Sequence, residues 1–78
     1  SNANRLMVLC HLLDGEQSVG SLQAQLNLSQ SALSQHLAKL RDAGMVATRR
    51  ERQTIFYRIA DTRVQRMIDA LYSIYCAP

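Results

Sequence analysis

The sequence predicts a mainly α-helical domain with one small β-hairpin, in the order helix, helix, helix, hairpin, helix. Four stretches carry apolar residues at helical spacing, and a serine or an aspartate precedes three of them. Two runs rich in β-branched and aromatic residues lie between the third and fourth stretches. The 78 residues suit one domain, expected to span residues 4–78. Residues 1–3 are either the scar of a removed tag or a native lead-in.

The first two predicted helices are short. The first lies within residues 4–14, and its apolar stripe is Leu6, Leu9, Cys10 and Leu13. An Asp-Gly pair ends it as a turn. Ser18 is a suitable N-cap for the second helix, because its hydroxyl can accept a bond from a free backbone N–H. The apolar stripe of the second helix is Val19, Leu22 and Leu26.

A longer third helix is expected from Gln30 to about Ala43. Ser29 precedes it as an N-cap. Its buried face is predicted to be Leu33, Leu37 and Leu40, which follow helical spacing. Gly44 stands where a glycine commonly ends a helix, since glycine tolerates the left-handed backbone conformation found there.

The runs MVATRR and TIFYRIA, separated by Glu51-Arg52-Gln53, predict a β-hairpin. Its register stays open, because the turn lacks an Asn-Gly signal. Asp61 can cap the last helix. The apolar stripe of this helix is the most regular in the chain: Val64, Met67, Ile68, Leu71, Ile74 and Tyr75. Two short helices followed by a strand hairpin are the order of a winged helix-turn-helix, ααα-ββ-α.

The outward face of the third helix predicts DNA reading. No carboxylate precedes Asp42 in that helix, although acids normally favour a helix start, and short polar groups suit docking against phosphates. Glutamine can pair with adenine, and serine can bond to several bases. Ordinary solvent-facing residues would also fit this pattern. The candidate DNA-binding residues, including those of the basic hairpin, are Ser29, Gln30, Ser31, Ser34, Gln35, Lys39, Arg50, Arg52 and Gln53.

The charge distribution supports a polyanionic partner. Formal net charge is +3, yet residues 39–66 hold eight of the nine basic residues and only three acidic ones. A salt-bridged surface would give the same composition. No apolar run approaches the length needed to span a membrane. Two cysteines are too few for the disulfide framework of a small secreted domain, so a cytoplasmic protein is expected. No catalytic constellation or cofactor motif is found, so we expect no enzyme and no cofactor.

The stretch SLQAQLNLSQSALSQHLAKLRDAGMVATRRERQTIFYRI resembles the ArsR/SmtB family of bacterial repressors. The resemblance is close at Ser29, Ser31, Ser34, Gln35, His36, Leu37, Leu40, Gly44 and Val46. It implies a homodimer that binds an inverted-repeat operator in double-stranded DNA. By the same resemblance, the third helix reads the major groove and the hairpin is the wing. A winged-helix module that binds other proteins is the alternative, and a DNA reader would differ from it in steep salt dependence.

The family also implies a chemical signal. Its metal sites need clustered Cys, His or carboxylate ligands, and neither the stretch SVGSLQAQLN nor the last helix supplies them, so no metal is expected. Cys10 and Cys76 resemble the pair in the sulfur-responsive branch, which implies derepression when the two become bridged or oxidised. The residues alone favour two ordinary small apolar cysteines, and only the resemblance favours the switch. That branch also implies an alternative role as an anti-repressor that activates virulence genes.

Overall fold

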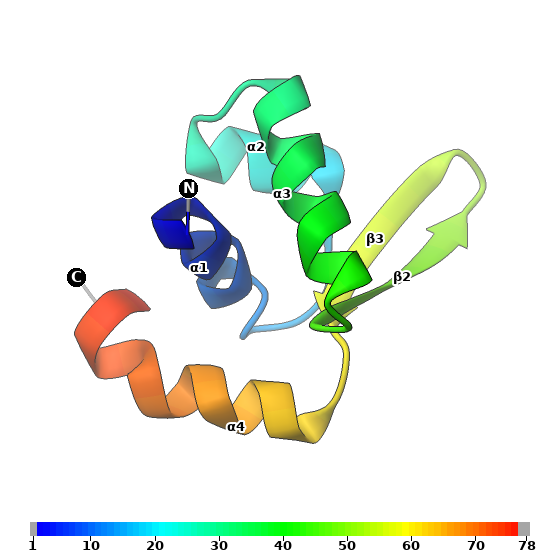
Figure 1. Ribbon diagram of the computed structural model, residues 1–78. Helices are drawn as coiled ribbons and strands as arrows, with labels where there is room; N and C mark the ends of the chain where they lie inside the picture. The colour runs from blue at the N-terminus through cyan, green and yellow to red at the C-terminus, as the bar shows by residue number, and fades with distance from the viewer. Residues whose placement is uncertain (1, 77–78) are drawn as a thin grey trace.

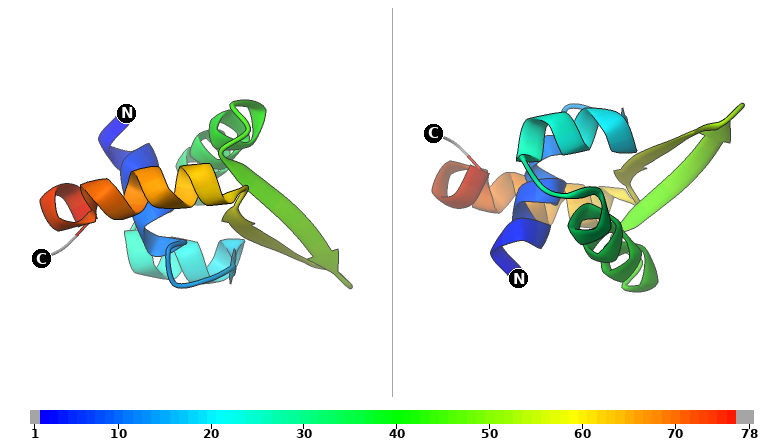
Figure 2. Two further views of the ribbon diagram at one scale, coloured as in Figure 1. Left: turned by 90° about the horizontal axis from the view of Figure 1, so that it is seen from below. Right: turned by 90° about the horizontal axis from the view of Figure 1, so that it is seen from above.

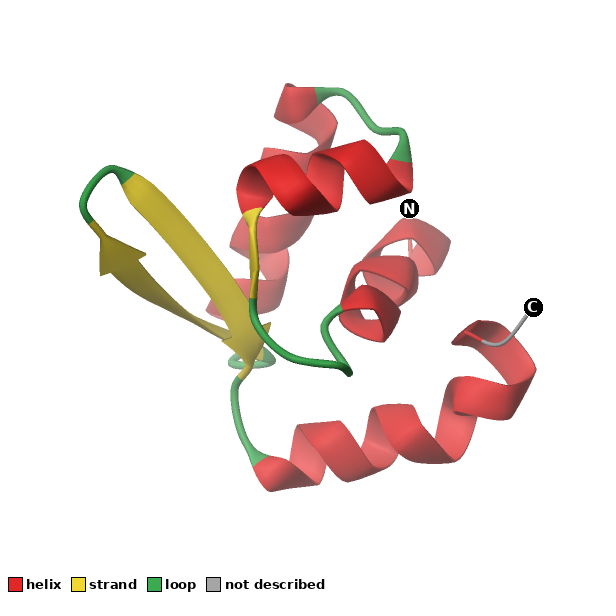
Figure 3. Cartoon of the chain, turned by 180° about the vertical axis from the view of Figure 1, so that it is seen from behind, coloured by secondary structure: helices red, strands yellow, loops and turns green. Residues whose placement is uncertain are grey.

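The computed structural model describes residues 2–76, with side chains for residues 3–74. The helices are α1 (Asn2–His11), α2 (Val19–Leu26), α3 (Gln30–Asp42) and α4 (Thr62–Leu71), and α4 runs on into the π-helical turn η1 (Tyr72–Cys76). The strands are β1 (Gln17–Ser18), β2 (Val46–Glu51) and β3 (Thr54–Ile59). Helix α1 lies between α2 and α3 on one side and α4 on the other (Figures 1 and 3). The winged helix-turn-helix order is therefore confirmed.

The three predicted N-caps all form, because each depends only on neighbouring residues. The Ser18 hydroxyl accepts from the Ser21 amide at 3.1 Å, and the Ser29 hydroxyl accepts from the Ala32 amide at 3.2 Å. The Asp61 carboxylate accepts from the amides of Arg63 and Val64. These bonds hold the pKa of Asp61 below its ordinary value, and the bond from the Val64 amide has the largest effect.

Helices α2 and α3 are joined by three residues. Asn27 ends α2 in the left-handed conformation, with φ of 54°, which asparagine tolerates better than most residues. Gly44 has φ of 75° after α3, as predicted, and the amides of Gly44 and Met45 donate to Arg41 and Leu40 carbonyls. This Schellman arrangement satisfies the last carbonyls of α3 and turns the chain into β2.

Strands β2 and β3 form the predicted hairpin, which projects away from the helices in every view (Figures 1 and 2). Its register pairs Val46 with Ile59 and Glu51 with Thr54, so the turn consists of Arg52 and Gln53. The two-residue strand β1 pairs with β3, giving the order β1-β3-β2. The sequence did not predict β1, because two residues are too few to show an alternating pattern.

One apolar core joins all four helices and the base of the hairpin. It consists of Val8, Leu9, Leu12, Leu22, Leu33, Leu37, Leu40, Val46 and Ile68. The predicted buried face of α3 is confirmed at its three leucines. The predicted stripe of the first helix is only partly right, because Val8 and Leu12 are buried while Leu6 and Leu13 are half-buried.

Helix α4 buries much less of its stripe than its regularity suggested. Ile68 is buried, whereas Met67 is 45% exposed and Ile74 is 68% exposed. Tyr75 lies outside the residues whose side chains the structure describes. Helical spacing identifies an apolar face, but it does not say whether the same chain covers that face. Among residues 2–76, no helix is both long and apolar enough to cross a bilayer.

Candidate nucleic-acid interface

The outward face of α3 is polar and open to solvent. Its exposed members are Gln30, Ser31, Ser34, Gln35 and Lys39. The first turn of α3 contains no acidic residue, and its basic residues lie in the last turn. Ser29 is exposed too, but its hydroxyl already accepts the capping bond from Ala32. This face can therefore offer glutamine and serine hydrogen-bonding groups to base edges, with Lys39 available for phosphate.

An open hollow of about 550 Å³ lies between α3 and the hairpin. Gln30 and Ser34 line it from α3, and Gln53 and Thr54 line it from the hairpin. Gly20, near the start of α2, borders the same space, and nothing lies within 4 Å of a side-chain carbon placed there. The structure thus brings Gln30, Ser34 and Gln53 to a single concave surface.

Arg50, Arg52 and Gln53 stand exposed at the tip of the hairpin. Arg52 takes the left-handed conformation, with φ of 58°, where a glycine or asparagine would be expected in a tight turn. The Arg50 Nε donates to the Arg52 carbonyl oxygen at 2.8 Å. That bond holds the Arg50 guanidinium near the turn, so two positive charges are concentrated at the hairpin tip.

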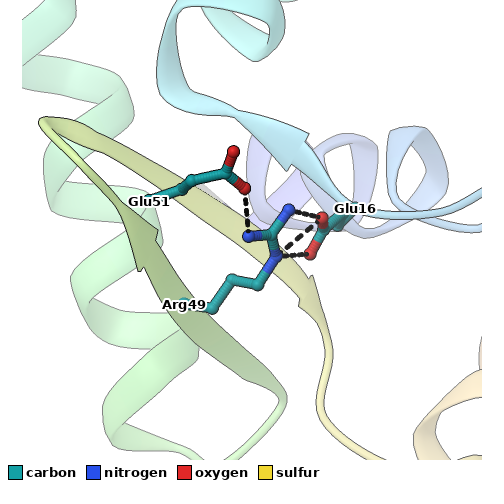
Figure 4. A network of polar contacts seen from close by, with 3 residues as sticks. All are labelled: Glu16, Arg49 and Glu51. Carbon is teal, nitrogen blue, oxygen red and sulfur yellow. Dashed lines mark hydrogen bonds and ion pairs between the residues drawn. The ribbon is translucent and has the colours of Figure 1, made fainter.

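Arg49 has a different role from its basic neighbours (Figure 4). Its Nε donates to both carboxylate oxygens of Glu16, at 2.8 and 2.9 Å, and its Nη1 pairs with Glu51 at 2.7 Å. Its guanidinium carbon lies 4.6 Å from the centroid of the Phe56 ring. The bonds from Arg49 lower the pKa of Glu16, and the two carboxylates raise the pKa of Arg49. Arg49 therefore fastens the middle of β2 to the loop before β1.

The link between Glu16 and Arg49 was not predicted. The two residues are 33 positions apart, and neither belongs to a local motif that would pair them. The pairing of β1 and of β2 with opposite edges of β3 brings the loop before β1 within reach of the Arg49 side chain on β2. No sequence signal in a single chain could have identified this contact.

His36 lies on the buried face of α3 and is the one buried polar residue among the described side chains. It is 8% exposed, and its Nδ1 has no hydrogen-bond partner among the residues that the structure describes. Burial lowers the pKa of His36, and the positive charges of Arg5 and Lys39 lower it further. A neutral imidazole therefore suits this position better than an imidazolium.

We expect the free energy of unfolding to fall as the pH drops from 7 towards 5. The folded-state pKa of His36 is lowered, so the unfolded chain binds the proton more readily. This stability is fully present above the unfolded pKa of about 6.5, and it is lost as the pH falls through the folded pKa. Urea denaturation of the H36L variant should lack this loss. The H11Q variant, which changes the other histidine, should retain it, and an equal loss in H36L would contradict the assignment.

Cys10 lies in the last turn of α1 and is half-buried. It is disulfide-bonded in this structure. It borders a hollow of about 210 Å³ together with His11, Asp14, Gln17 and Gln25. Helix α1 packs against η1, the segment that ends at Cys76, but the side chain of Cys76 lies outside the described residues. Among the described residues, no group of three or more His, Cys, Asp or Glu side chains is gathered as a metal site would require.

Comparison of the sequence with known proteins identifies its relatives. Residues 2–48 match the family model described as bacterial regulatory protein, arsR family. The chain is 57% identical over 76 residues to the transcriptional activator HlyU of Vibrio cholerae, and this match covers 97% of the chain and 70% of HlyU. It is 55% identical to the biofilm growth-associated repressor of Agrobacterium fabrum, a match that covers 95% of the chain and 63% of the repressor.

Solved structures agree with the sequence comparisons. Reduced HlyU from Vibrio cholerae N16961 matches with a TM-score of 0.87 at 57% identity, covering 95% of this chain and 78% of that one. The homodimeric winged helix-turn-helix DNA-binding domain of Mb0332 from Mycobacterium bovis matches with a TM-score of 0.86 at 30% identity, covering 95% of this chain and 68% of that one. The chain is thus shorter than these relatives, and it spans 63% of the Agrobacterium repressor.

Proposed function

The chain belongs to the ArsR family of bacterial regulatory proteins, and from that premise we propose that it represses transcription as a homodimer bound to an inverted-repeat operator. It is a transcriptional regulator, as its relatives are. We further propose that bridging of Cys10 and Cys76 releases it from DNA. The observation that carries the DNA-binding proposal is the polar face of α3, whose first turn has no acidic residue and which borders one hollow with the basic hairpin.

Repression and activation are both represented among the relatives. The Agrobacterium relative is a repressor, and the Vibrio relative is an activator. The second candidate function is therefore activation by displacement of another silencer. A reporter gene behind the native promoter, compared with and without the regulator in a strain that lacks the silencer, separates the two. A repressor lowers expression in that strain, whereas an anti-repressor has no effect there.

Fluorescence anisotropy with labelled duplex DNA tests the DNA-binding proposal. The operator is first selected from a pool of random duplexes, and binding is then measured at 50 and 200 mM salt. A protein that makes several phosphate contacts loses about 10³-fold or more in affinity over this range. A winged helix that binds only other proteins would bind no duplex tightly at either salt concentration.

Removing a positive charge from the hairpin tip should make binding less sensitive to salt. We expect R50A and R52A each to reduce the slope of log K against log salt by about one unit, because each removes one phosphate contact. Arg66 is an exposed arginine of α4, on the opposite side of α1 from α3, so R66A is the matched control. An unchanged slope in R50A and R52A, or an equal change in R66A, would remove the hairpin tip from the interface.

The exposed apolar surface of α4 and η1 supports a dimer. Met67, Tyr72 and Ile74 are 44–68% exposed, although apolar side chains of this size gain by being covered. The Mycobacterium relative is a homodimer. Sedimentation equilibrium should give twice the mass of 8.8 kDa at micromolar concentration, and I74E should shift the equilibrium towards monomer. A monomer at all concentrations would contradict the dimer for this chain.

The redox proposal rests on Cys10 in a disulfide, on α1 packed against the segment that ends at Cys76, and on a relative studied in a reduced form. With hydrogen disulfide as the oxidant, two protein thiols and one H₂S₂ yield one protein disulfide and two H₂S. The S–S bond of H₂S₂ is reduced as the two cysteines are oxidised. Mass spectrometry of peptides from treated protein should find Cys10 joined to Cys76. Operator affinity should fall at the same time, and a linked protein that binds as tightly as the reduced one would refute this switch.

A further inference from the structure

We propose that residues 12–17, which form the loop after α1 and the first residue of β1, carry the state of Cys10 to the two DNA-facing elements, helix α3 and the hairpin. Gln17 links this segment to the helix-turn-helix, and Glu16 links it to the hairpin. The inference deepens the proposed redox control and rests on it. It adds a physical route by which a change at the end of α1 reaches surfaces that the cysteine does not touch.

The segment is tied directly to the last turn of α1. The Leu13 amide donates to the Cys10 carbonyl oxygen at 3.3 Å, and the Gly15 amide donates to the Leu12 carbonyl at 3.2 Å. Leu12 is 1% exposed and belongs to the core. These contacts leave the segment little freedom, so a displacement of Cys10 must move the residues that follow it.

Gln17 lies at the centre of a closed polar cluster with α2. Its amide nitrogen donates to the His11 carbonyl, and its amide oxygen accepts from the Ser21 hydroxyl at 2.9 Å and from the Gln25 amide. The Gln25 oxygen in turn faces the His11 Nδ1 at 3.1 Å. Four side chains thus join the end of α1 to α2, the helix that precedes the DNA-facing helix α3.

Glu16 provides the second link. Its carboxylate holds Arg49 of β2 through both oxygens (Figure 4). The Arg49 guanidinium also lies over the Phe56 ring of β3. Next to it, β1 pairs Gln17 with Tyr57 and Ser18 with Phe56. The middle of the hairpin is therefore fastened to the same short segment that fastens α2.

This arrangement makes the segment the shared support of α2 and the hairpin. Simultaneous docking of a helix and a wing depends on their relative placement, and a dimer must in addition hold two such units at fixed spacing. Because Cys10 is disulfide-bonded in this structure, these placements belong to the bridged form, and a shift of the end of α1 on reduction would alter both together. Side chains along such a route can change coupling between two sites without touching either ligand.

The test compares operator affinity of the bridged and reduced forms in variants of the full chain. The ratio of the two dissociation constants is expected to fall towards one by about 2- to 30-fold in E16Q and in Q25A. Cysteine bridging, followed by mass, should remain complete. The operator affinity of the reduced form should stay within about threefold of wild type, because neither Glu16 nor Gln25 is among the candidate DNA-binding residues.

Two matched controls isolate the links. E51Q neutralises the other carboxylate that pairs with the Arg49 guanidinium. Glu51 lies within the hairpin, so this variant leaves Glu16 attached to Arg49. Q23A changes a glutamine of α2 outside the cluster. Both should keep the wild-type ratio. A ratio reduced equally in controls and test variants, or unchanged in E16Q and Q25A, would overturn the proposal.

Hydrogen exchange on the wild-type protein gives a readout without substitution. Bridging should change amide exchange in residues 17–25 and 46–57 as well as in α1, whereas a change confined to α1 and η1 would overturn the route even if a variant failed to fold. The wild-type arm separates the two proposals. Bridging without loss of operator affinity refutes the redox control, and the coupling route with it. A normal wild-type response that persists in E16Q and Q25A refutes the route alone.

Discussion

Replacing Gln35 with alanine is expected to lower affinity for the selected operator by roughly 5- to 150-fold, the value of one good two-point contact to a base. The side chain is exposed on α3 and makes no hydrogen bond to other described side chains, so its loss should leave the fold intact. Affinity for a duplex of scrambled sequence should stay within about twofold, since nonspecific binding depends on phosphate contacts.

Lys39 is the matched comparison for Gln35, because it lies one turn further along α3 and is also exposed. If Lys39 contacts phosphate, K39A should weaken operator and scrambled duplex by similar factors and reduce the salt slope. Equal weakening of both duplexes in Q35A would instead show that Gln35 positions the protein without reading sequence. An unchanged operator affinity in Q35A would remove this residue from the interface.

Local chemistry explains what could be predicted of the fold. The caps at Ser18, Ser29 and Asp61 and the helix end at Gly44 each need only a few neighbouring residues, and each formed as expected. The buried leucines of α3 followed from helical spacing. These features depend on backbone geometry that is the same in any protein, so one sequence is enough to identify them.

Contacts between distant residues could not be predicted in the same way. The sequence shows Arg49 as one more basic residue of the hairpin. The structure instead pairs it with Glu16 and Glu51, so its charge is not available to the candidate interface. Lys39, Gln35 and Arg52 are exposed as expected, but exposure follows from the helix face and the turn alone. What the site adds is the hollow between Ser34 and Gln53, which needs the register of the hairpin.

The stability of the DNA-facing helix rests on the leucines beneath it, and the L37A variant measures how much. Leu37 is 1% exposed in the core, so removing its side-chain carbons leaves a cavity, and the expected cost is about 2–5 kcal/mol. A domain of this size is stabilised by roughly 4–12 kcal/mol in total, so the variant should melt at least about 8 °C lower.

Thermal unfolding followed by circular dichroism, in reductant and at fixed protein concentration, measures this loss, because dimerisation would otherwise shift the midpoint. Ile55 is 42% exposed on the hairpin, so I55A is the control and should cost less than about 1 kcal/mol. A small loss in L37A would mean that α3 is held mainly by its caps and by β2. A large loss, with operator affinity near wild type at low temperature, would separate the face of α3 that holds the fold from the face that meets DNA.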